Sequence, residues 1–318
     1  METSPFLLPD LQTLTAVLTS VLNGKRCKGG QVIVLDRQKN IYASSARSEI
    51  VMCRLPDGTE LRLFCKYEVR EKLAWSDVAY EAKVYRHVLE ASAATTPRFY
   101  GAYTEASTGK TWLILEHLDN TVFMNGTTAQ MCLAARWLGQ FHAANEVCLE
   151  GPPLQFLKVY DVEYYLERVR RTLRYAGDLH EGLVWLPTLC LRFEEFARPL
   201  LAKRRTVTHG DFYWNNVLLL NGTVYVIDWE MAGIDQGEMD LARLTVGWLV
   251  ETERKCELEY QKARWPGGAP ADFERTMDAA RLCLYFCTLG AQPDWPTNEG
   301  FLWYSKRLRS LGERLGLT

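Results

Sequence analysis

The chain has 318 residues, 47% of them hydrophobic, and a formal net charge of −2. This length and hydrophobic content are enough for two domains or two unequal lobes. A net charge this close to zero lacks the strong positive potential with which proteins attract nucleic acids or anionic membranes, so we expect neither as a partner.

The cysteines and the first residues indicate the compartment. Nine cysteines are scattered from Cys27 to Cys287, and none forms a CxxC pair or a Cys/His cluster with zinc spacing. Many unpaired thiols are typical of a reducing cytosol. The first twenty residues lack the basic start and continuous apolar run of a signal peptide, and no apolar stretch is long enough to span a bilayer. We therefore expect a cytoplasmic protein.

The first third of the chain has a β-rich pattern. Five segments read as strands, at residues 31–35, 49–55, 60–66, 97–103 and 111–116. The second and third flank Pro56-Asp57-Gly58, a turn sequence, and so predict an antiparallel hairpin. Between the third and fourth, Ser76 and Asp77 offer capping side chains for a helix that ends near Glu90. We expect a small antiparallel β-rich lobe with one prominent helix, residues 1–117.

After Leu118 the pattern becomes helical. Apolar residues at helical spacing predict helices over 128–145 and 161–173, and the region from Gly237 onward predicts three more. One β element interrupts them, because the apolar segments 217–220 and 223–227 flank Asn221-Gly222, the strongest short hairpin signal. The fold class that we expect is α+β, with a larger, mainly helical lobe over residues 118–318.

The residues beside this hairpin are candidates for chemistry. Asp211 and Asn216 precede it and Asp228 follows it. Because a hairpin returns the chain to its starting point, we expect the three side chains to meet. A carboxylate and an amide oxygen suit Mg²⁺ when substrate phosphates fill the rest of its shell, and a second carboxylate can accept or orient a hydroxyl proton. Phosphoryl transfer needs these parts.

The ordered set His209-Gly210-Asp211, Asn216 and Ile227-Asp228 resembles the catalytic core of the aminoglycoside phosphotransferase and choline kinase families. These are relatives of the protein kinases, whose catalytic loop has arginine in place of Gly210. The resemblance implies a bilobal kinase-like fold and an enzyme that moves the terminal phosphoryl group of Mg-ATP, or of GTP, to a hydroxyl. It implies that Asp211 is the catalytic base or hydroxyl-orienting group and that Asn216 and Asp228 hold Mg²⁺.

The resemblance extends into the first lobe. Lys66 ends the third strand and Glu81 lies on the following helix, where the kinase fold has an ion pair that positions the nucleotide phosphates. The segment 113–118 resembles the inter-lobe hinge, which implies that Glu116 and Leu118 contact adenine through backbone groups.

One loop departs from the protein-kinase pattern. The loop over residues 43–48 contains no glycine, so a Gly-rich phosphate flap is absent, and Ser44 and Ser45 are placed near the phosphates instead. No GxxxxGK[ST] motif occurs anywhere in the chain, which excludes the P-loop kinases.

Four further residues have supporting roles by resemblance or by context. His209 is expected to brace the catalytic loop, and His142, inside a predicted helix, to be a core histidine. Asp240 matches a family position that anchors the catalytic loop, although an acid at a helix N-terminus is also stabilised by the helix dipole. Glu230 has three open interpretations: an indirect contact with the metal, a surface position, or a position that supports the residues around the metal.

The acceptor is indicated only by class. The segment 237–318 carries many arginines and lysines and several aromatic residues besides its acids, whereas a polycationic aminoglycoside calls for a cluster of carboxylates. We therefore expect a hydroxyl-bearing small metabolite or natural product. Two alternatives stay open, namely a kinase acting on Ser or Thr of a peptide precursor and a non-catalytic nucleotide-binding module. The second is disfavoured because Lys66, Asp211, Asn216 and Asp228 are all intact.

Overall fold

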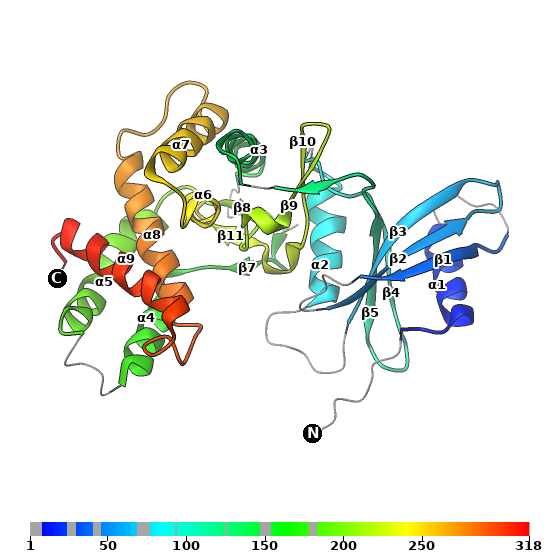
Figure 1. Cartoon of the computed structure of the whole chain (residues 1–318), viewed down its shortest axis with the longest axis horizontal. Helices are drawn as coiled ribbons and strands as arrows, with labels where there is room; N and C mark the ends of the chain where they lie inside the picture. Colours follow the sequence, from blue (N-terminus) through cyan, green and yellow to red (C-terminus); the bar gives the residue numbers. More distant parts are fainter. Residues whose placement is uncertain are drawn as a thin grey trace. The chain divides into compact units, whose positions relative to one another are not determined.

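The computed structural model describes residues 8–23, 30–40, 46–68, 77–92, 94–124, 126–146, 154–177 and 183–317 (Figure 1). The chain divides into two compact units. The first contains Met1–Val122 and Leu218–Met231, and the second contains Phe123–Val217 and Ala232–Thr318. The segment 218–231, which the sequence analysis placed in the second lobe, thus groups with the first unit. The assignment of lobes 1–117 and 118–318 to nucleotide and acceptor remains a prediction.

A five-stranded antiparallel sheet forms most of the first unit. Its order is β1-β2-β3-β5-β4, with bounds β1 (Ile33–Lys39), β2 (Arg47–Arg54), β3 (Glu60–Tyr67), β4 (Phe99–Thr104) and β5 (Thr111–Glu116). The predicted hairpin is confirmed by the pairing of β2 with β3 around Gly58, whose φ of 86° suits glycine. The first strand begins two residues later than expected and ends four later. It is an edge strand, and its Ile33 and Leu35 stay 57% and 39% exposed, so its apolar run was a poor guide to its bounds.

Two helices cover the sheet. The helix α1 (Leu11–Asn23), which the sequence analysis did not predict, packs Leu14, Leu18 and Leu22 into one core with Cys65, Tyr67 and Ile114 of the sheet. The helix α2 (Val78–Val84) has Asp77 as its N-cap, whose side chain accepts a hydrogen bond from the Tyr80 amide, and it continues as a π-helical turn, η1 (Tyr85–Leu89). Because side chains alternate along a strand, Lys66 faces away from the core that contains Cys65 and Tyr67. It therefore points to the α2 side of the sheet.

The hairpin of β9 (Val217–Leu220) and β10 (Thr223–Val226) follows its predicted sequence closely. Asn221 and Gly222 both have positive φ, 51° and 80°, as a two-residue hairpin turn requires. The Thr95 hydroxyl donates to the Val224 carbonyl at 2.5 Å, which ties the hairpin into the first unit. A 3-10 turn, η5 (Trp229–Met231), follows.

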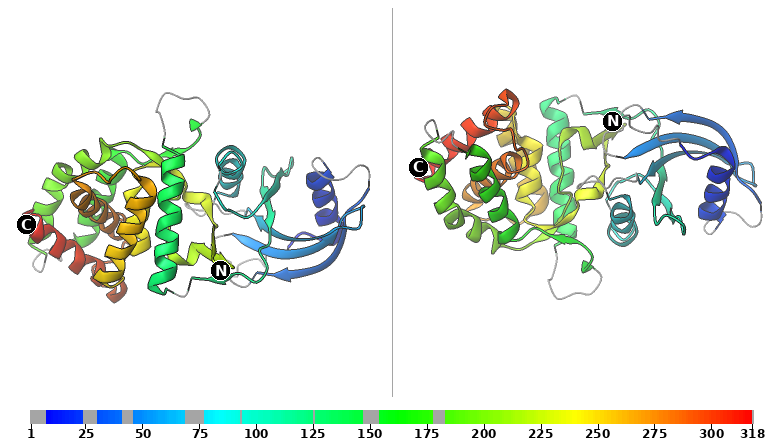
Figure 2. Two further views of the ribbon diagram at one scale, coloured as in Figure 1. Left: turned by 90° about the horizontal axis from the view of Figure 1, so that it is seen from above. Right: turned by 90° about the horizontal axis from the view of Figure 1, so that it is seen from below.

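The second unit is mainly helical. Its helices are α3 (Thr128–Ala144), α4 (Val162–Ala176), α5 (Trp185–Leu201), α6 (Glu238–Thr245), α7 (Val250–Arg264), α8 (Phe273–Leu289) and α9 (Glu299–Arg314). Figure 2 shows α3 and α7 side by side, and α8 packs against α4, α5, α6 and α9. Short strands complete the unit: β6 (Val122–Phe123), which begins at the boundary, and the sheet of β7 (Lys158–Val159), β11 (Gly233–Asp235) and β8 (Thr206–Thr208).

Two helix predictions were wrong in number. The sequence predicts three helices after Gly237 and the structure has four, because the chain turns at Gly247, where φ is 83°. The helix α5 was not predicted at all; it contains Pro199 near its end. Within the described residues, no helix is both long enough and apolar enough to cross a membrane.

Candidate active site

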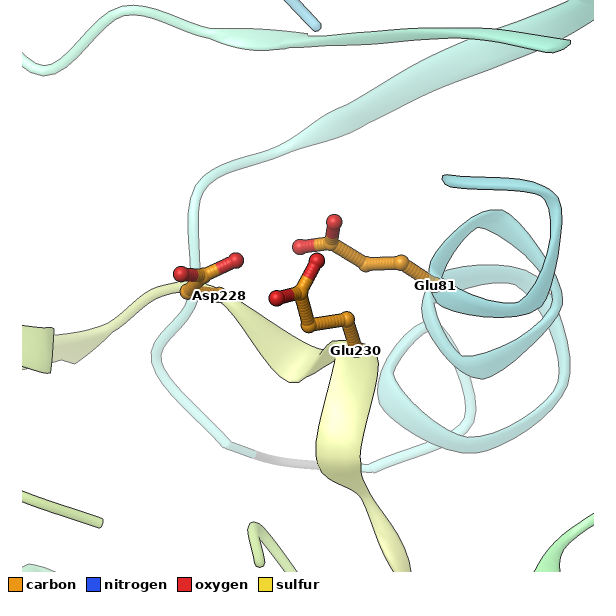
Figure 3. A group of neighbouring side chains, drawn as sticks. All are labelled: Glu81, Asp228 and Glu230. Atoms are coloured by element: carbon orange, nitrogen blue, oxygen red, sulfur yellow. The ribbon is translucent and has the colours of Figure 1, made fainter. Parts of the chain in front are cut away.

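In the first unit, three carboxylates converge on one ammonium group. The Lys66 Nζ lies 2.8 Å from Glu81 Oε2, 2.5 Å from Asp228 Oδ1 and 3.3 Å from Glu230 Oε2. Figure 3 shows how the three acids face one another, Glu81 from α2 and the other two from the segment after β10. Oxygens of the three carboxylates lie within 4.8 Å of one another.

The backbone at Asp228 is unusual. Its φ is 67°, in the left-handed region that non-glycine residues seldom adopt. Residues held there cost free energy and persist where the surrounding structure fixes them, often at functional sites. The Trp229 amide donates to Glu81 Oε1 at 3.1 Å and fixes the turn from the other side.

The electrostatics of this cluster are strongly coupled. Burial would lower the pKa of Lys66, but Glu81, Asp228 and Glu230 together raise it well above its ordinary value, so the lysine is charged. Burial raises the pKa of Glu81 and raises that of Glu230 to about 7, while Lys66 opposes both shifts. Three carboxylates against one ammonium leave the fully ionised cluster with a formal charge of 1 − 3 = −2.

This excess of negative charge fits a divalent cation. Carboxylate oxygens are the ligand type that Mg²⁺ prefers, and side-chain exposure tells which of the three can reach one. The Asp228 side chain is 32% exposed, whereas those of Glu81 and Glu230 are 2% and 10% exposed. Asp228 is therefore the carboxylate of the three that a cation could reach, and Glu81 contacts Lys66 and the Trp229 amide.

In the second unit, Asp240 anchors the loop that carries Asp211. Its two carboxylate oxygens accept hydrogen bonds from the backbone amides of His209, at 2.6 Å, and Gly210, at 3.0 Å. Gly210 has a φ of 79°, a value that favours glycine. With this backbone conformation, the amides of His209 and Gly210 both point to the Asp240 carboxylate. His209 is buried, and its Nδ1 accepts a hydrogen bond from the Asp211 amide at 3.2 Å.

Asn216 holds the Asp211 side chain. Its Nδ2 donates to Asp211 Oδ2 at 2.9 Å and to the Asp211 carbonyl at 2.8 Å. Both of these hydrogen bonds use the amide nitrogen, so Asn216 Oδ1 is the atom that could serve a metal. Asp211 and Asn216 belong to the second unit and Asp228 to the first, so the meeting of all three stays a prediction.

A buried polar network supports Asp240 from α3 and α7. His142 on α3 has its Nε2 3.4 Å from Asp240 Oδ2 and its Nδ1 3.0 Å from the Tyr260 hydroxyl. The Arg264 guanidinium contacts the same hydroxyl at 2.5 Å and Glu238 at 3.2 Å. Burial lowers the pKa of His142, although Asp240 opposes the shift. His142 is thus a core histidine that also touches the anchor of the loop.

The remaining predicted site residues are only partly described. The Glu116 amide donates to the Arg98 carbonyl at 2.9 Å, and the Leu118 carbonyl accepts from the Thr121 hydroxyl at 3.1 Å. Ser44 and Ser45 lie outside the described residues. The contact of Glu230 with Lys66 was missed from the sequence; its position two residues after Asp228 was the only available signal.

The fold and these clusters define a kinase-like phosphotransferase. The sequence profile of the phosphotransferase enzyme family matches residues 66–281. No curated protein sequence matches the chain. Among solved structures, the chain is similar to a candidate aminoglycoside phosphotransferase from Ralstonia eutropha, with TM-score 0.66, 14% identity and 96% of each chain covered. It is also similar to choline kinases from Cryptosporidium parvum, with TM-score 0.62, 12% identity and 96% of each chain covered, and from Streptococcus pneumoniae, with TM-score 0.58, 11% identity and 96% and 99% covered.

The family match spans two thirds of the chain, from Lys66 of β3 to Arg281 of α8. The chain therefore belongs to the phosphotransferase enzyme family, and it is an enzyme of the aminoglycoside-phosphotransferase type. The predicted family and the predicted α+β kinase-like fold are confirmed.

Proposed function

We propose that the protein transfers the terminal phosphoryl group of Mg-ATP, or of GTP, to a hydroxyl group of a small metabolite or natural product. The observation that carries the proposal is the pair Asp211 and Asn216, in which one amide fixes a carboxylate on a loop clamped by Asp240. A similar solved structure, a spectinomycin phosphotransferase with TM-score 0.56 and 12% identity, was determined with ADP and spectinomycin. Family membership supports small-molecule phosphoryl transfer as the reaction class.

The first unit supplies the nucleotide-binding groups in this proposal. Lys66 contacts the phosphates, and Glu81 keeps its ammonium in place. The Glu116 carbonyl and the Leu118 amide serve as acceptor and donor for adenine. Ser44 and Ser45 contribute hydroxyl or backbone N–H groups to the phosphates.

Magnesium would be held by Asp228 and Asn216. When bound, it would neutralise phosphate charge and make the terminal phosphoryl group a better electrophile. The preference of Mg²⁺ for oxygen ligands favours the Asp228 carboxylate and Asn216 Oδ1. Glu230 lies 3.3 Å from Lys66 Nζ and acts on this site through that contact.

Asp211 acts on the acceptor. Its carboxylate accepts a hydrogen bond from the acceptor hydroxyl, which orients the oxygen toward the phosphoryl group. It receives the proton as the new O–P bond forms and the bond from the terminal phosphorus to the leaving nucleoside diphosphate breaks. Because Asn216 holds one carboxylate oxygen, the other is the one that meets the hydroxyl. His209 supports the loop backbone and takes no part in the proton transfer.

The test compares Asp211→Asn with His209→Gln. We expect Asp211→Asn to lower kcat by about 10²–10⁴-fold with the nucleotide Kd nearly unchanged, because general-base contributions have that size. His209→Gln should lower kcat or stability modestly and add no new pH dependence. Nucleotide turnover with a panel of acceptors, together with nucleotide binding by calorimetry, measures both.

Three outcomes separate this proposal from its alternatives. Transfer to peptides but not to small molecules would make the protein a peptide kinase. Nucleotide binding without turnover on any acceptor would make it a binding module. If Asp211→Asn stayed active while His209→Gln lost the chemistry, the two roles would be reversed.

A further inference from the structure

Arg243, on α6, is a buried cation with few partners. Its side chain is 8% exposed, and its one ion pair among the described residues is a 3.5 Å contact from Nη1 to Asp240 Oδ1. A guanidinium carries five N–H donors, so a single contact at this distance leaves most of them unused. None of its nitrogens is among the fully buried side-chain atoms without a hydrogen-bond partner, so the unused N–H groups reach the small exposed part of the side chain and could donate to a ligand anion.

The nearby acids are committed elsewhere. Asp240 already accepts from two backbone amides of the Asp211 loop at 2.6 and 3.0 Å. Asp235 accepts from the Tyr165 hydroxyl at 2.5 Å and from the Gln236 amide at 2.8 Å. Arg243 thus shares Asp240 with the two loop amides, and it has no ion pair with Asp235 among the described residues.

Arg264 shows what a structural arginine looks like in the same unit. It is as buried as Arg243, with a side chain 2% exposed, yet it pairs with Glu238 at 3.2 Å and with the Tyr260 hydroxyl at 2.5 Å. Its guanidinium also lies 4.6 Å from the ring centre of Trp265. Arg264 thus has close partners at its terminal nitrogens and over its ring-facing side, although its Nε has no hydrogen-bond partner among the described residues.

A second arginine of the same unit has no carboxylate partner among the described residues. Arg168, on α4, has its guanidinium 5.1 Å from the ring centre of Tyr164, and it forms no ion pair with the described residues. On the same helix, Arg170 and Arg171 pair with Glu163 and Glu167. Burial raises the pKa of Cys287 to about 11, and the charges of Arg243 and Arg168 both oppose the rise, so both arginines lie near α8.

The position of Arg243 relates it to the acceptor. It follows Asp240 by one helical turn, and Asp240 holds the loop that ends in Asp211. Tyr213, whose amide donates to the Asp211 carbonyl at 2.8 Å, has its pKa raised by burial, and the positive charge of Arg243 opposes that shift. The guanidinium therefore lies close to the catalytic loop within the second unit.

We propose that the acceptor carries a carboxylate or phosphate group besides its hydroxyl, and that Arg243 binds this anion while Asp211 meets the hydroxyl. The inference rests on the proposed function and adds the charge of the substrate to it. Arg168 supplies a second positive charge, and the planar guanidinium of Arg243 suits the two oxygens of a carboxylate. A cationic acceptor would meet like charge and bind weakly.

The test uses the smallest hydroxyl compounds that are negative, neutral and positive. Compounds of this size have too few atoms to be kept out of the acceptor site by their shape. Glycolate, ethylene glycol and ethanolamine are titrated into the full-length protein saturated with Mg-ADP, and binding is followed by saturation-transfer NMR. We expect glycolate to bind about tenfold or more tighter than ethylene glycol, the size of one hydrogen bond to a charged group, and ethanolamine to bind weakest. Arg243→Gln should remove the preference and Arg243→Lys should keep part of it.

Arg281→Gln is the matched control, since it also removes one largely buried positive charge, on α8, where Arg281 pairs with Glu253, Glu257 and Asp278. It should leave the preference for glycolate intact. An equal or better affinity for ethanolamine in the wild-type protein would overturn the inference, as would an unchanged preference in Arg243→Gln. Binding of glycolate to the nucleotide-free protein that is lost on addition of Mg-ADP would also overturn it, because Arg243 would then serve the nucleotide phosphates.

A second readout keeps this inference separate from the proposed function. With Mg-ATP, ³¹P NMR follows the phosphoryl group to the glycolate hydroxyl or to water. Arg243-dependent binding of glycolate without phosphoryl transfer to any acceptor would leave the anion site standing and refute the proposed function. Asp211-dependent transfer with no charge preference would do the reverse.

Discussion

Lys66 shows how one residue can serve both stability and function. The residue is 7% exposed, and its ammonium contacts three carboxylates in the first unit. Removing one partner of a buried ion pair leaves uncompensated charge, which costs about 3–5 kcal/mol. The same ammonium is the proposed phosphate contact, so stability and nucleotide binding should respond together when it is lost.

We predict that Lys66→Met lowers the free energy of unfolding by about 3–5 kcal/mol and weakens nucleotide binding. The double variant Lys66→Met/Glu81→Gln should regain part of the stability, because one buried negative charge is removed, but none of the nucleotide binding. Urea unfolding and calorimetric titration measure the two effects. A double variant no more stable than Lys66→Met would contradict the charge argument.

Asp235 predicts a pH dependence of stability. Burial raises its pKa to about 7, and Tyr165 opposes the shift through its hydrogen bond. The folded protein therefore holds a proton that the unfolded chain releases above its own pKa near 4. This contribution to stability is present below about pH 4 and is lost as the pH rises to 7. A pKa of Asp235 raised from about 4 in the unfolded chain to about 7 in the folded protein corresponds to about 4 kcal/mol of the free energy of unfolding.

The variant Asp235→Asn isolates this effect. The difference in the free energy of unfolding between wild type and variant should move by up to about 4 kcal/mol in favour of the variant between pH 4 and pH 7. Urea unfolding at several pH values gives the difference and cancels the contributions of other groups. A difference that is constant over this range would show that Asp235 titrates normally.

At the scale of single residues, ordered motifs singled out five side chains, namely Lys66, Glu81, Asp211, Asn216 and Asp228. The structure contains the Lys66–Glu81 ion pair and the Asn216–Asp211 hydrogen bond, and the roles of the five residues stay predictions. The contact of Glu230 with Lys66 and the positive φ of Asp228 depend on how β10 ends against α2, which no local pattern records. Arg243 was not singled out, since an arginine one turn after Asp240 looks like an ordinary helix residue until its burial is known.

At the scale of elements, α6 links the catalytic loop to the helical core. All eight of its residues are buried, and Asp240 near its start receives two loop amides. An acid in the first helical turn is also stabilised by the helix dipole, so both interpretations offered for Asp240 apply to the same side chain. Because α6 is fully buried, its Asp240 holds the backbone of the loop that carries Asp211 in a fixed place.

We predict that Asp240→Asn lowers kcat by about tenfold or more while the nucleotide Kd changes little. An asparagine side chain can accept only one of the two amide hydrogen bonds, and a hydrogen bond to a charged group contributes about 1.5–3 kcal/mol. Steady-state kinetics and calorimetry check this expectation. Asp278→Asn, which alters an acid of α8 away from the loop, is the control and should leave kcat unchanged.

Elements with local signals were predicted well and those shaped by packing were not. The hairpins around Gly58 and around Asn221-Gly222 were found because their turns need particular residues. The helices α1 and α5 were missed. Five of the thirteen residues of α1 are threonine or valine, which have low helix propensity, and Pro199 interrupts the pattern of α5. The stability of both helices therefore depends on packing against neighbours.

At the scale of the whole molecule, the chain passes between its two units three times. Residues 218–231 belong to the first unit, although they follow residues 123–217 of the second unit in the sequence. These residues bring Asp228 and Glu230 to Lys66 and the Trp229 amide to Glu81. The first unit is therefore incomplete until more than two thirds of the chain exists.

We predict that a fragment of residues 1–122 unfolds at much lower urea than the full chain, and that a peptide of residues 216–232 added in trans raises its midpoint. The fragment has lost two of the three carboxylates that balance Lys66. The same peptide with Asp228→Asn and Glu230→Gln should stabilise less. Equal stabilisation by both peptides would show that the hairpin contributes through its strands alone.

The left-handed backbone of Asp228 means that the residue needed for the proposed chemistry is not the residue that would make the folded protein most stable. At a φ of 67°, a side chain costs about 1 kcal/mol or more relative to glycine, so Asp228→Gly should be more stable than Asp228→Ala, the reverse of the usual order in regular structure. Both variants should lack phosphoryl transfer. A duplicated gene freed from the need for that reaction would gain by replacing Asp228, and glycine would be the favoured replacement. We therefore expect that a homologue with glycine at this position no longer catalyses phosphoryl transfer, and its sequence alone would identify it.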